Sequence, residues 1–209
     1  MTSDSSRHHW TVSEVSDVSG PPALLRNYLE QQDLRHCLRA AAKAKPLRTG
    51  ADVGCGYGRL TLVLSEFASE AVVGFEREPA LLRQARALMP GIEFRETPSL
   101  DRLPADEAAF DFVMTFTVLQ HMREPDALAV IRELKRVSSG FALLVEETDP
   151  SFVDGDPAPE GTGITVGREE STYAGWMEPW PMILSFPRRI EPGYPRADVG
   201  HFMLFAKSG

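Results

Sequence analysis

The sequence of 209 residues predicts an α/β domain in which helices cover both faces of a seven-stranded, mostly parallel sheet with an antiparallel last strand. Over residues 1–150, short apolar segments alternate with longer segments of helical periodicity, which is typical of parallel strands joined by right-handed crossovers. A glycine-rich stretch, "ADVGCGYGRL" at residues 51–60, follows the first of these apolar segments. Near the end of the chain, two strand-like segments follow each other without a helix, which indicates an antiparallel pair at the sheet edge.

The first half of the alternation begins with a helix. Gly20, Pro21 and Pro22 precede a segment rich in helix-forming residues, with apolar positions at helical spacing. We therefore expect, in chain order, a helix at 22–44, a strand at 47–54, a helix at 58–68, a strand at 71–76, a helix at 78–89 and a strand at 91–96.

The second half begins after a polar loop at residues 97–109, and its first strand is apolar enough to lie inside a sheet. Residues 149–168 are rich in Pro, Gly and Asp, which indicates an inserted loop or lid. The expected elements here are strands at 110–118 and 140–147 around a helix at 126–137, a short helix at 170–180, and strands at 181–192 and 199–208.

Composition limits the classes of function. The formal net charge of -8 argues against a nucleic-acid partner, because neutralising phosphates requires a basic face. The two cysteines give no disulfide framework and no zinc spacing. Apolar runs are too short to span a membrane, and the first residues lack the apolar core of a signal peptide. We expect a soluble, cytoplasmic monomer or homodimer, with a cap segment and helix at 1–45 and a main domain at 46–209 that carries a lid-like insertion around 149–180.

The glycine-rich turn predicts a ligand that carries a ribose. Gly54, Gly56 and Gly58 allow close approach of a ligand to the backbone at the carboxyl end of a strand. A phosphate loop would need a Lys-Ser or Lys-Thr pair, which is absent, and the third glycine comes one residue early for a dinucleotide loop. Glu76 ends the next strand, where an acid binds ribose hydroxyls; the alternative is a solvated acid at a strand end.

Four segments in this order and spacing resemble the class I S-adenosylmethionine-dependent methyltransferases over residues 48–147. They are "ADVGCGYGRL", "VVGFEREPALLRQARAL", "FDFVMTFTVLQHMREPDALAVIRELKRV" and "FALLVEE". The resemblance implies a Rossmann-like fold, S-adenosylmethionine as cofactor and S-adenosylhomocysteine as product. Two positions depart from the family pattern: Ser99 stands where an acid usually contacts the adenine, and "KRVSSGF" replaces a Pro-Gly-Gly turn.

The resemblance also implies roles for individual residues around the cofactor. Asp52 anchors the glycine turn, the three glycines border the methionine part, and Glu76 binds the ribose. The remaining implied contacts are Arg77 and Leu100 along the adenine, Ser99 at its edge, and Phe116 and Thr117 at the methionine end.

Methyl transfer from a sulfonium is an in-line displacement that needs an aligned, deprotonated nucleophile, and no metal is required. His121, just after the fourth strand, is the candidate base because an imidazole has an ordinary pKa near 6.5; a structural histidine is the alternative. Glu146 and Glu147 end the fifth strand at the same sheet edge. We expect one of them to face the acceptor and the other to be solvated, and strand alternation leaves open which is which.

The acceptor wall is expected to come from segments outside the core of the domain. Trp10 is a candidate cap, with a disordered tail as the alternative. Tyr173 and Trp176 are candidates for an apolar pocket, although aromatics at this helical spacing are commonly core residues. Arg168 either recognises a carboxylate or, as we expect, pairs with Glu169 or Glu170.

These observations predict an enzyme that methylates an oxygen, nitrogen or carbon atom of a small molecule. The alternative is an enzyme of the same fold that binds the cofactor and catalyses a non-methylating reaction, since fold does not fix function. A nicotinamide-dependent oxidoreductase is disfavoured by the glycine spacing and by the antiparallel edge pair. A non-catalytic interaction domain is disfavoured by the intact turn with Asp52 and Glu76. The acceptor, its reactive atom and the pathway are left open by the sequence.

Overall fold

The computed structural model describes residues 21–156, 163–190 and 200–208. Its helices are α2 (Pro21–Ala44), α3 (Thr61–Ser65), α4 (Pro79–Leu88), the 3-10 helix η1 (Leu119–His121), α5 (Glu124–Val137) and α6 (Glu170–Met177). Its strands are β1 (Thr49–Val53), β2 (Ala71–Glu76), β3 (Glu93–Glu96), β4 (Phe110–Phe116), β5 (Ser138–Glu146), β6 (Val153–Asp156), β7 (Gly163–Val166), β8 (Met182–Pro187) and β9 (His201–Ala206). Each predicted helix and sheet strand is present, with shifted ends. Trp10, the predicted cap residue, lies outside the described residues.

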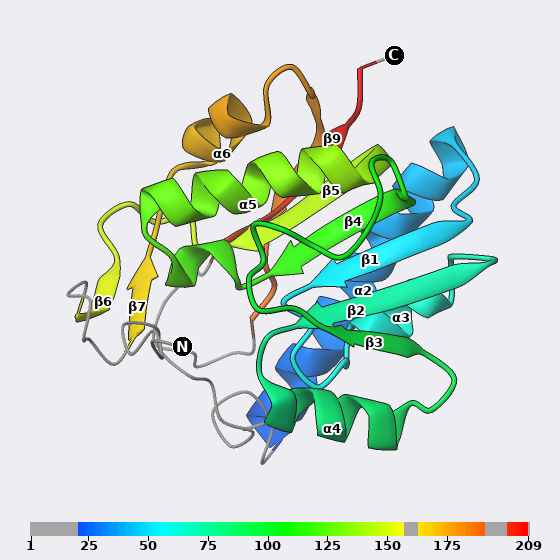
Figure 1. Ribbon diagram of the computed structural model, residues 1–209. Helices are drawn as coiled ribbons and strands as arrows, with labels where there is room; N and C mark the ends of the chain where they lie inside the picture. The colour runs from blue at the N-terminus through cyan, green and yellow to red at the C-terminus, as the bar shows by residue number, and fades with distance from the viewer. Residues whose placement is uncertain (1–20, 157–162, 191–199, 209) are drawn as a thin grey trace.

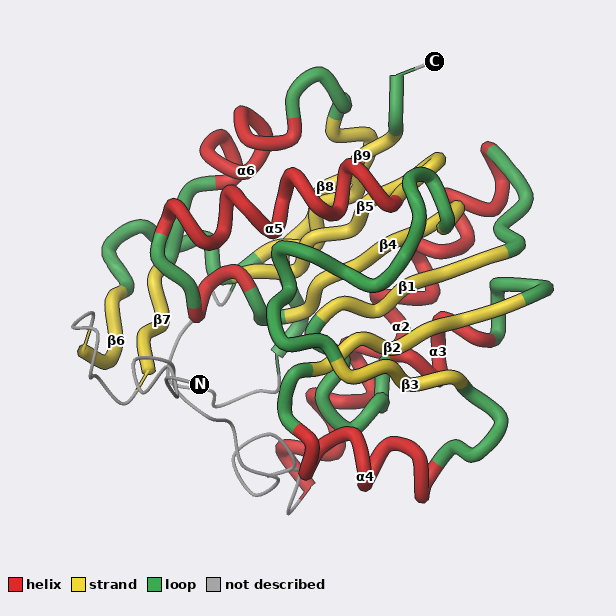
Figure 2. Tube along the Cα trace, in the orientation of Figure 1, coloured by secondary structure: helices red, strands yellow, loops and turns green. Residues whose placement is uncertain are grey.

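The main sheet has seven strands in the order β3-β2-β1-β4-β5-β9-β8. The strands from β3 to β5 are parallel, and β9 runs antiparallel to both β5 and β8, which confirms the predicted edge pair. Figure 2 shows these strands as one continuous layer, with the β6–β7 pair apart from it. The strand order reverses between β1 and β4, and ligands of such sheets bind at the carboxyl ends of strands at this point.

Helices cover both faces of the sheet. In Figure 1, α5 lies in front of the sheet, while α2 and α3 lie behind it. The front core contains Val130, Ile131 and Leu134 of α5 together with Tyr173 of α6. The rear core contains Leu34, Cys37, Leu38 and Ala41 of α2, which pack against the sheet with Leu64 of α3. The helix α2 therefore belongs to the same core as the sheet.

The segment at 149–168 differs from its prediction as a loop. Residues 153–156 and 163–166 form an antiparallel two-stranded sheet, with Val153 opposite Val166 and Gly155 opposite Ile164. The high content of Pro, Gly and Asp conceals these strands, because only a few β-branched residues mark them. β7 lies against η1, which brings the insertion to the carboxyl edge of the main sheet.

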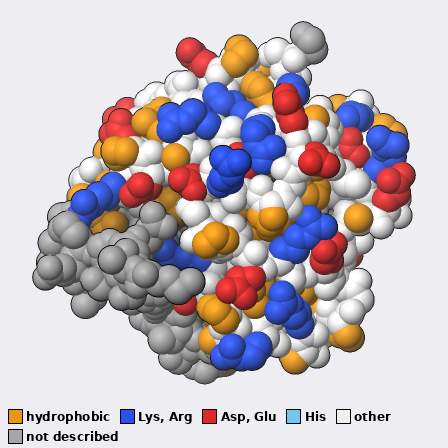
Figure 3. All heavy atoms as spheres, in the orientation of Figure 1, with side chains coloured by type: hydrophobic (Ala, Val, Ile, Leu, Met, Phe, Trp, Pro, Cys, Tyr) orange, Lys and Arg blue, Asp and Glu red, His pale blue; other side chains and the backbone are white. Residues whose placement is uncertain are grey.

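The described surface is mixed in charge. Figure 3 shows basic and acidic side chains interspersed over one face of the molecule, with apolar side chains scattered between them. None of the helices in the described ranges combines the length and apolar character needed to cross a bilayer.

Candidate active site

The glycine turn between β1 and α3 adopts a backbone that L-residues rarely take. The φ angles of Gly54, Gly56 and Gly58 are 78°, 58° and 86°. The N–H groups of Gly54 and Cys55 donate to the carbonyl of Phe75 in β2, at 2.8 and 3.0 Å. These bonds hold the turn beside the end of β2, at the point where the strand order reverses.

The first glycine of the turn lies in a tight cradle. A Cβ atom at Gly54 would lie 2.6 Å from Cγ2 of Val118 and 3.6 Å from Cδ1 of Leu100. A side chain at Gly58 would meet Met89 at 2.5 Å and Phe94 at 2.8 Å. The structure therefore joins Gly54 to Leu100 and to the turn after β4, and a side chain at Gly54 would clash with Val118. This cradle fits the nucleoside cofactor that the sequence predicts.

Glu76 closes the cradle from the end of β2. One carboxylate oxygen accepts from the backbone N–H of Gly56 at 2.9 Å. The other accepts from the backbone N–H groups of Arg77 at 2.8 Å and Glu78 at 3.0 Å. The residue is only 7% exposed, so the alternative of a solvated acid at the strand end is wrong. A carboxylate has about four acceptor sites, so it retains capacity for a hydroxyl group of a ligand.

Asp52 lies beneath the turn and is 2% exposed. Its carboxylate accepts from the Thr61 hydroxyl, at 2.6 Å, and so links the end of β1 to the start of α3. Burial raises the pKa of Asp52 to about 7, although the Thr61 hydrogen bond and the charge of Arg59 act in the opposite direction.

The loop after β3 carries the predicted adenine contacts. Leu100 is 8% exposed and approaches Gly54, as described above. The hydroxyl of Ser99 donates to the carboxylate of Asp101. An acid is therefore present in this loop two residues after the position at which the family pattern places it. Arg77 lies half-buried beside Glu78, with 3.3 Å between its Nε and Oε1 of that carboxylate.

The turn after β4 is strained. Thr117 has a φ of 54°, an uncommon angle for a β-branched residue, which costs about 1–3 kcal/mol. Its N–H donates to the carbonyl of Val145 at 2.7 Å, which holds the turn against β5. Such strain is commonly found at functional sites. The phenyl ring of Phe116 lies under two guanidinium groups, with the carbon of Arg59 at 5.3 Å and that of Arg188 at 5.2 Å from the ring centroid.

Glu146 supports this turn from inside the protein. Its side chain is fully buried and accepts from the Thr115 hydroxyl at 2.9 Å and from the N–H groups of Val118 and Gln120 at 3.1 Å. Burial raises its pKa to about 7, against the effect of these hydrogen bonds. The geometry gives Glu146 a positioning role, and direct catalysis by it remains a prediction.

Glu147 differs from its expected environment. We expected one of the two adjacent acids to be solvated, but Glu147 is 4% exposed. The reason is that Gly167 and Arg168, which follow β7, and Tyr173 of α6 pack against Glu147, which strand alternation alone does not reveal. Its carboxylate accepts from the N–H of Asp149 at 3.0 Å, and its own N–H donates to the side chain of Gln120 at 2.9 Å.

His121 lies at the end of η1 with a defined tautomer. Its Nδ1 is 2.9 Å from the carbonyl oxygen of Ile164 in β7. A carbonyl only accepts, so Nδ1 carries a proton; the Thr165 hydroxyl also lies 3.2 Å from Nδ1. The side-chain amide of Gln120 lies 3.4 Å from Nε2. The imidazole is partly exposed, and its role as a base remains a prediction.

The predicted aromatic wall lies mainly in the core. Tyr173 is fully buried, and its ring contacts that of Trp176 edge-on, with centroids 5.5 Å apart. Trp176 is partly buried against the same core. This placement supports the alternative of core aromatics and gives no support to Tyr173 as a pocket residue, because α6 turns that face toward α5.

Arg168 was expected to pair with Glu169 or Glu170, and this was wrong. Its guanidinium instead donates to the carbonyls of Leu119 at 3.1 Å and Met122 at 2.5 Å, and it lies over the ring of Trp176. It therefore ties β7 to both ends of η1. Buried carbonyls at the end of a helical turn need such donors.

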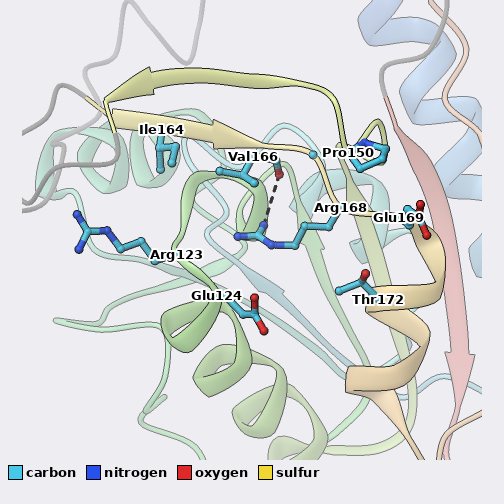
Figure 4. A pocket seen from close by; sticks show the side chains of 9 residues that line it. Arg123, Glu124, Pro150, Ile164, Val166, Arg168, Glu169 and Thr172 are labelled. Carbon is cyan, nitrogen blue, oxygen red and sulfur yellow. Dashed lines mark hydrogen bonds between the residues drawn. The ribbon is translucent and has the colours of Figure 1, made fainter.

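A cavity of about 480 Å³ lies on the outer side of this region, between β7 and the first turns of α5 and α6. Figure 4 shows Arg168 in its centre, with a hydrogen bond to the carbonyl of Val166, and Arg123, Glu124 and Thr172 around it. The cavity is separate from the glycine turn. Among the residues that the structure describes, no group of three His, Cys, Asp or Glu side chains is placed to hold a metal ion.

Sequence reasoning missed three polar residues that the structure brings to the site: Arg59, Gln120 and Arg188. Arg59 follows the third glycine directly, and a cation in the turn of an acidic chain was a visible signal. Gln120 precedes His121 and is explained only by its contacts with the ring and with Glu147. Arg188 follows an edge strand, and no local pattern connects it to the glycine turn.

Residues 51–139 match the family model described as a methyltransferase domain. Curated relatives include trans-aconitate 2-methyltransferases of Rhizobium leguminosarum and Rhizobium etli, which are 26% and 28% identical over 82% of this chain. The chain spans 61% and 58% of the length of these two relatives.

Solved structures show the same fold. A magnesium protoporphyrin IX methyltransferase of Synechocystis with bound S-adenosylmethionine has a TM-score of 0.65 at 15% identity, over 87% of this chain and 81% of that one. A 1,6-didemethyltoxoflavin-N1-methyltransferase of Burkholderia thailandensis has a TM-score of 0.64 at 15% identity, over 91% and 92% of the two chains. The fold, the glycine turn and the matched methyltransferase domain agree with one another, and in these features this chain is similar to the class I S-adenosylmethionine-dependent methyltransferases.

Proposed function

We propose that the protein transfers a methyl group from S-adenosylmethionine to a small-molecule acceptor. The observation that carries this proposal is the cradle at the carboxyl ends of β1 and β2, where three glycines have positive φ, Gly56 donates to Glu76, and Gly54 lies against the strained turn after β4. The names of the relatives support a small acceptor, since they act on trans-aconitate or on 1,6-didemethyltoxoflavin. The net charge of -8 also favours a small molecule over a nucleic acid.

The cofactor would be held by the residues that the sequence predicts around the cradle. Glu76 would accept from ribose hydroxyls, Leu100 and Arg77 would border the adenine, and the backbone of the glycine turn would border the methionine. When bound, S-adenosylmethionine supplies an electrophilic methyl group. The role of the protein is then to align the acceptor with this group and to exclude water.

His121 would remove the proton from the acceptor. Its Nδ1–H is held by the carbonyl of Ile164, so the lone pair of Nε2 is directed away from that anchor. Glu146 and Arg168 would keep η1 in place, the first through the N–H groups of Val118 and Gln120, the second through the carbonyls of Leu119 and Met122. Holding the imidazole in one tautomer and one orientation keeps its basic nitrogen aligned with the acceptor, which favours proton transfer.

Calorimetric titration with S-adenosylmethionine, S-adenosylhomocysteine and NAD in parallel tests the cofactor. We expect the first two to bind with micromolar affinity and NAD not to bind. Mass spectrometry of reactions with candidate acceptors should then show a methylated product together with S-adenosylhomocysteine. Cofactor binding without any methylated product, but with another product of the same acceptor, would favour the non-methylating alternative.

His121→Ala tests the base. Turnover should fall about 10²- to 10⁴-fold, the usual contribution of a general base, with little change in the affinity for S-adenosylmethionine. His36→Ala is the matched control, because His36 is an exposed histidine on α2 whose ring contacts Phe186. If His121→Ala loses stability and turnover in parallel, the residue is structural, and the proposal of a base fails.

A further inference from the structure

Gln120 is a buried amide that lies between the end of β5 and the imidazole of His121. It is the middle residue of η1 and is 8% exposed. Its side-chain oxygen Oε1 accepts from the backbone N–H of Glu147 at 2.9 Å. Its own backbone N–H donates to the carboxylate of Glu146 at 3.1 Å. Two hydrogen bonds to consecutive residues therefore hold Gln120 in one position.

The contact with Glu147 fixes which end of the amide faces His121. A backbone N–H only donates, so the amide atom in front of it is the oxygen, and the NH2 group lies at the other end. The nitrogen Nε2 of Gln120 is 3.4 Å from Nε2 of His121, the length of a long hydrogen bond. An amide NH2 group only donates. The ring nitrogen in front of it therefore accepts and carries no proton.

The opposite ring nitrogen faces β7. Nδ1 of His121 lies 2.9 Å from the carbonyl oxygen of Ile164 and 3.2 Å from the hydroxyl of Thr165. The carbonyl requires a proton on Nδ1, but a doubly protonated imidazolium would satisfy it equally well. The amide on the other side makes the difference, because it disfavours a second proton on Nε2. Both neighbours together specify a neutral imidazole with its lone pair on Nε2.

The difference between glutamine and glutamate shows what the amide contributes. A glutamate at position 120 has the same size and accepts from the backbone N–H of Glu147 in the same way. Its second oxygen, however, would accept from the ring nitrogen instead of donating to it. With a negative charge beside the ring and an acceptor at each nitrogen, the imidazolium is favoured. A protonated ring cannot act as a base.

Other charged side chains lie on the elements around the ring. They are Glu146 and Glu147 at the end of β5, Arg168 after β7, and Arg123 and Glu124 at the start of α5. Arg168 donates to backbone carbonyls at both ends of η1. All of these groups are the same in the wild type and in a variant of residue 120. A difference in ring protonation between the two proteins therefore reports on that residue.

We propose that Gln120 is the positioning residue of the base: its amide keeps the imidazole of His121 neutral, with no proton on Nε2. The catalytic meaning of this inference rests on the proposed function, whereas the protonation of the ring is measurable without any activity. During the reaction, the proton-bearing group of the acceptor takes the place of the amide at Nε2.

NMR of the full chain with 15N-labelled histidine tests the proposal, because protonated and unprotonated ring nitrogens have well-separated chemical shifts. Gln120→Glu is the variant, and His121→Ala assigns the signals. Gln32→Glu is the matched control, since it makes the same change on a half-buried glutamine of α2. Thermal unfolding of each variant reports on folding.

In the wild type we expect Nδ1 of His121 to carry a proton and Nε2 to carry none at pH 7. The exposed His36 should gain its second proton at a higher pH than His121 does. In Gln120→Glu, both ring nitrogens of His121 should be protonated at pH 7. The acid limb of the turnover profile should then move upward by about 1–3 pH units, so that turnover recovers at high pH, with cofactor affinity unchanged.

A Gln120→Glu spectrum that matches those of the wild type and Gln32→Glu overturns the proposal. So does a loss of turnover that is equal at every pH, because residue 120 would then be only structural. The wild-type spectrum needs no variant to fold: a doubly protonated His121 ring at pH 7 also overturns it. Failure of the proposed function is recognised separately, since the wild type would then methylate no acceptor at any pH while the NMR result stands.

Discussion

The two halves of the proposed site are built by contacts of very different range. On the cofactor side, Thr61 is hydrogen-bonded to Asp52, 9 positions away in the sequence, and Gly56 is hydrogen-bonded to Glu76, 20 positions away. On the acceptor side, His121 bonds Ile164 across 43 residues and Arg168 bonds Leu119 across 49. Arg188 reaches Glu30 across 158 residues.

This difference explains which half was predictable. A turn that is stabilised within one strand-turn-helix-strand unit leaves its glycines and its acid at a fixed spacing, which a single sequence displays. A site assembled from the insertion, the edge strands and the first helix leaves no such spacing. The acceptor half can therefore vary while the cofactor half stays recognisable.

The largest expected effect comes from breaking the cofactor half at its centre. Gly54→Val places a branched side chain at a φ of 78° and 2.6 Å from Val118. Backbone strain costs about 1–3 kcal/mol and overpacking about as much again, so S-adenosylmethionine binding should be lost. Calorimetry measures the binding, and chemical denaturation measures the stability.

Gly91→Val is the matched control for this change, because nothing lies within 4 Å of a Cβ at that position. We expect the control to bind the cofactor normally. Normal binding by Gly54→Val itself would show that the turn does not contact the ligand, and the contrast between the two halves would then lose its basis.

The next effect concerns the acid beneath the acceptor half. Burial raises the pKa of Glu146 from 4.5 to about 7, so the folded state binds its proton more tightly than the unfolded state does. The free energy of unfolding should therefore fall as the pH rises from about 4.5 through about 7, by an amount of the order of 3 kcal/mol from this group. Glu146→Gln should flatten this part of the profile, as measured by urea unfolding at a series of pH values.

Asp111→Asn provides a contrast of opposite sign. Although burial acts the other way, hydrogen bonds from Lys45 and from the backbone N–H groups of Arg48 and Thr49 lower the pKa of Asp111 from 3.8 to about 2. Its contribution to the free energy of unfolding is present above about pH 4 and is lost as the pH falls toward 2.

For Glu146, the contradicting outcome is a stability profile of Glu146→Gln that parallels the wild type between pH 4.5 and 7. It would mean that Glu146 is ionised in the folded state.

The smallest of the three effects sharpens the cofactor side. Glu76→Ala should weaken S-adenosylmethionine by about 1–3 kcal/mol, the range for a hydrogen bond to a charged group. Glu96→Ala is the control, since Glu96 is the register neighbour of Glu76 on β3 and is exposed. Equal affinities for the two variants in calorimetric titration would remove Glu76 from the ribose site.

Much of the fold was predictable because its signals are local. Strands such as 71–76 are continuous apolar runs, and helices such as Pro79–Leu88 show apolar periodicity and a proline at their start. The hairpin formed by β6 and β7 was not predictable, since its few β-branched residues are surrounded by Pro, Gly and Asp. Glu147 shows the same limit: its burial depends on segments that follow it in the chain and cover the strand end.

The sequence by itself determined the alternation of strands and helices, the glycine turn with Asp52 and Glu76, and the resemblance to the methyltransferase family. Each of these depends on spacing within one or two adjacent elements, and the backbone geometry of those elements sets that spacing. Only the tertiary structure decided that Glu146 lies under η1, that Ile164 sets the tautomer of His121, and that Arg59 and Arg188 share Glu30. Charges and hydrogen bonds act over a few ångströms in space, whatever the distance along the chain, so these pairings become visible only once the chain is folded.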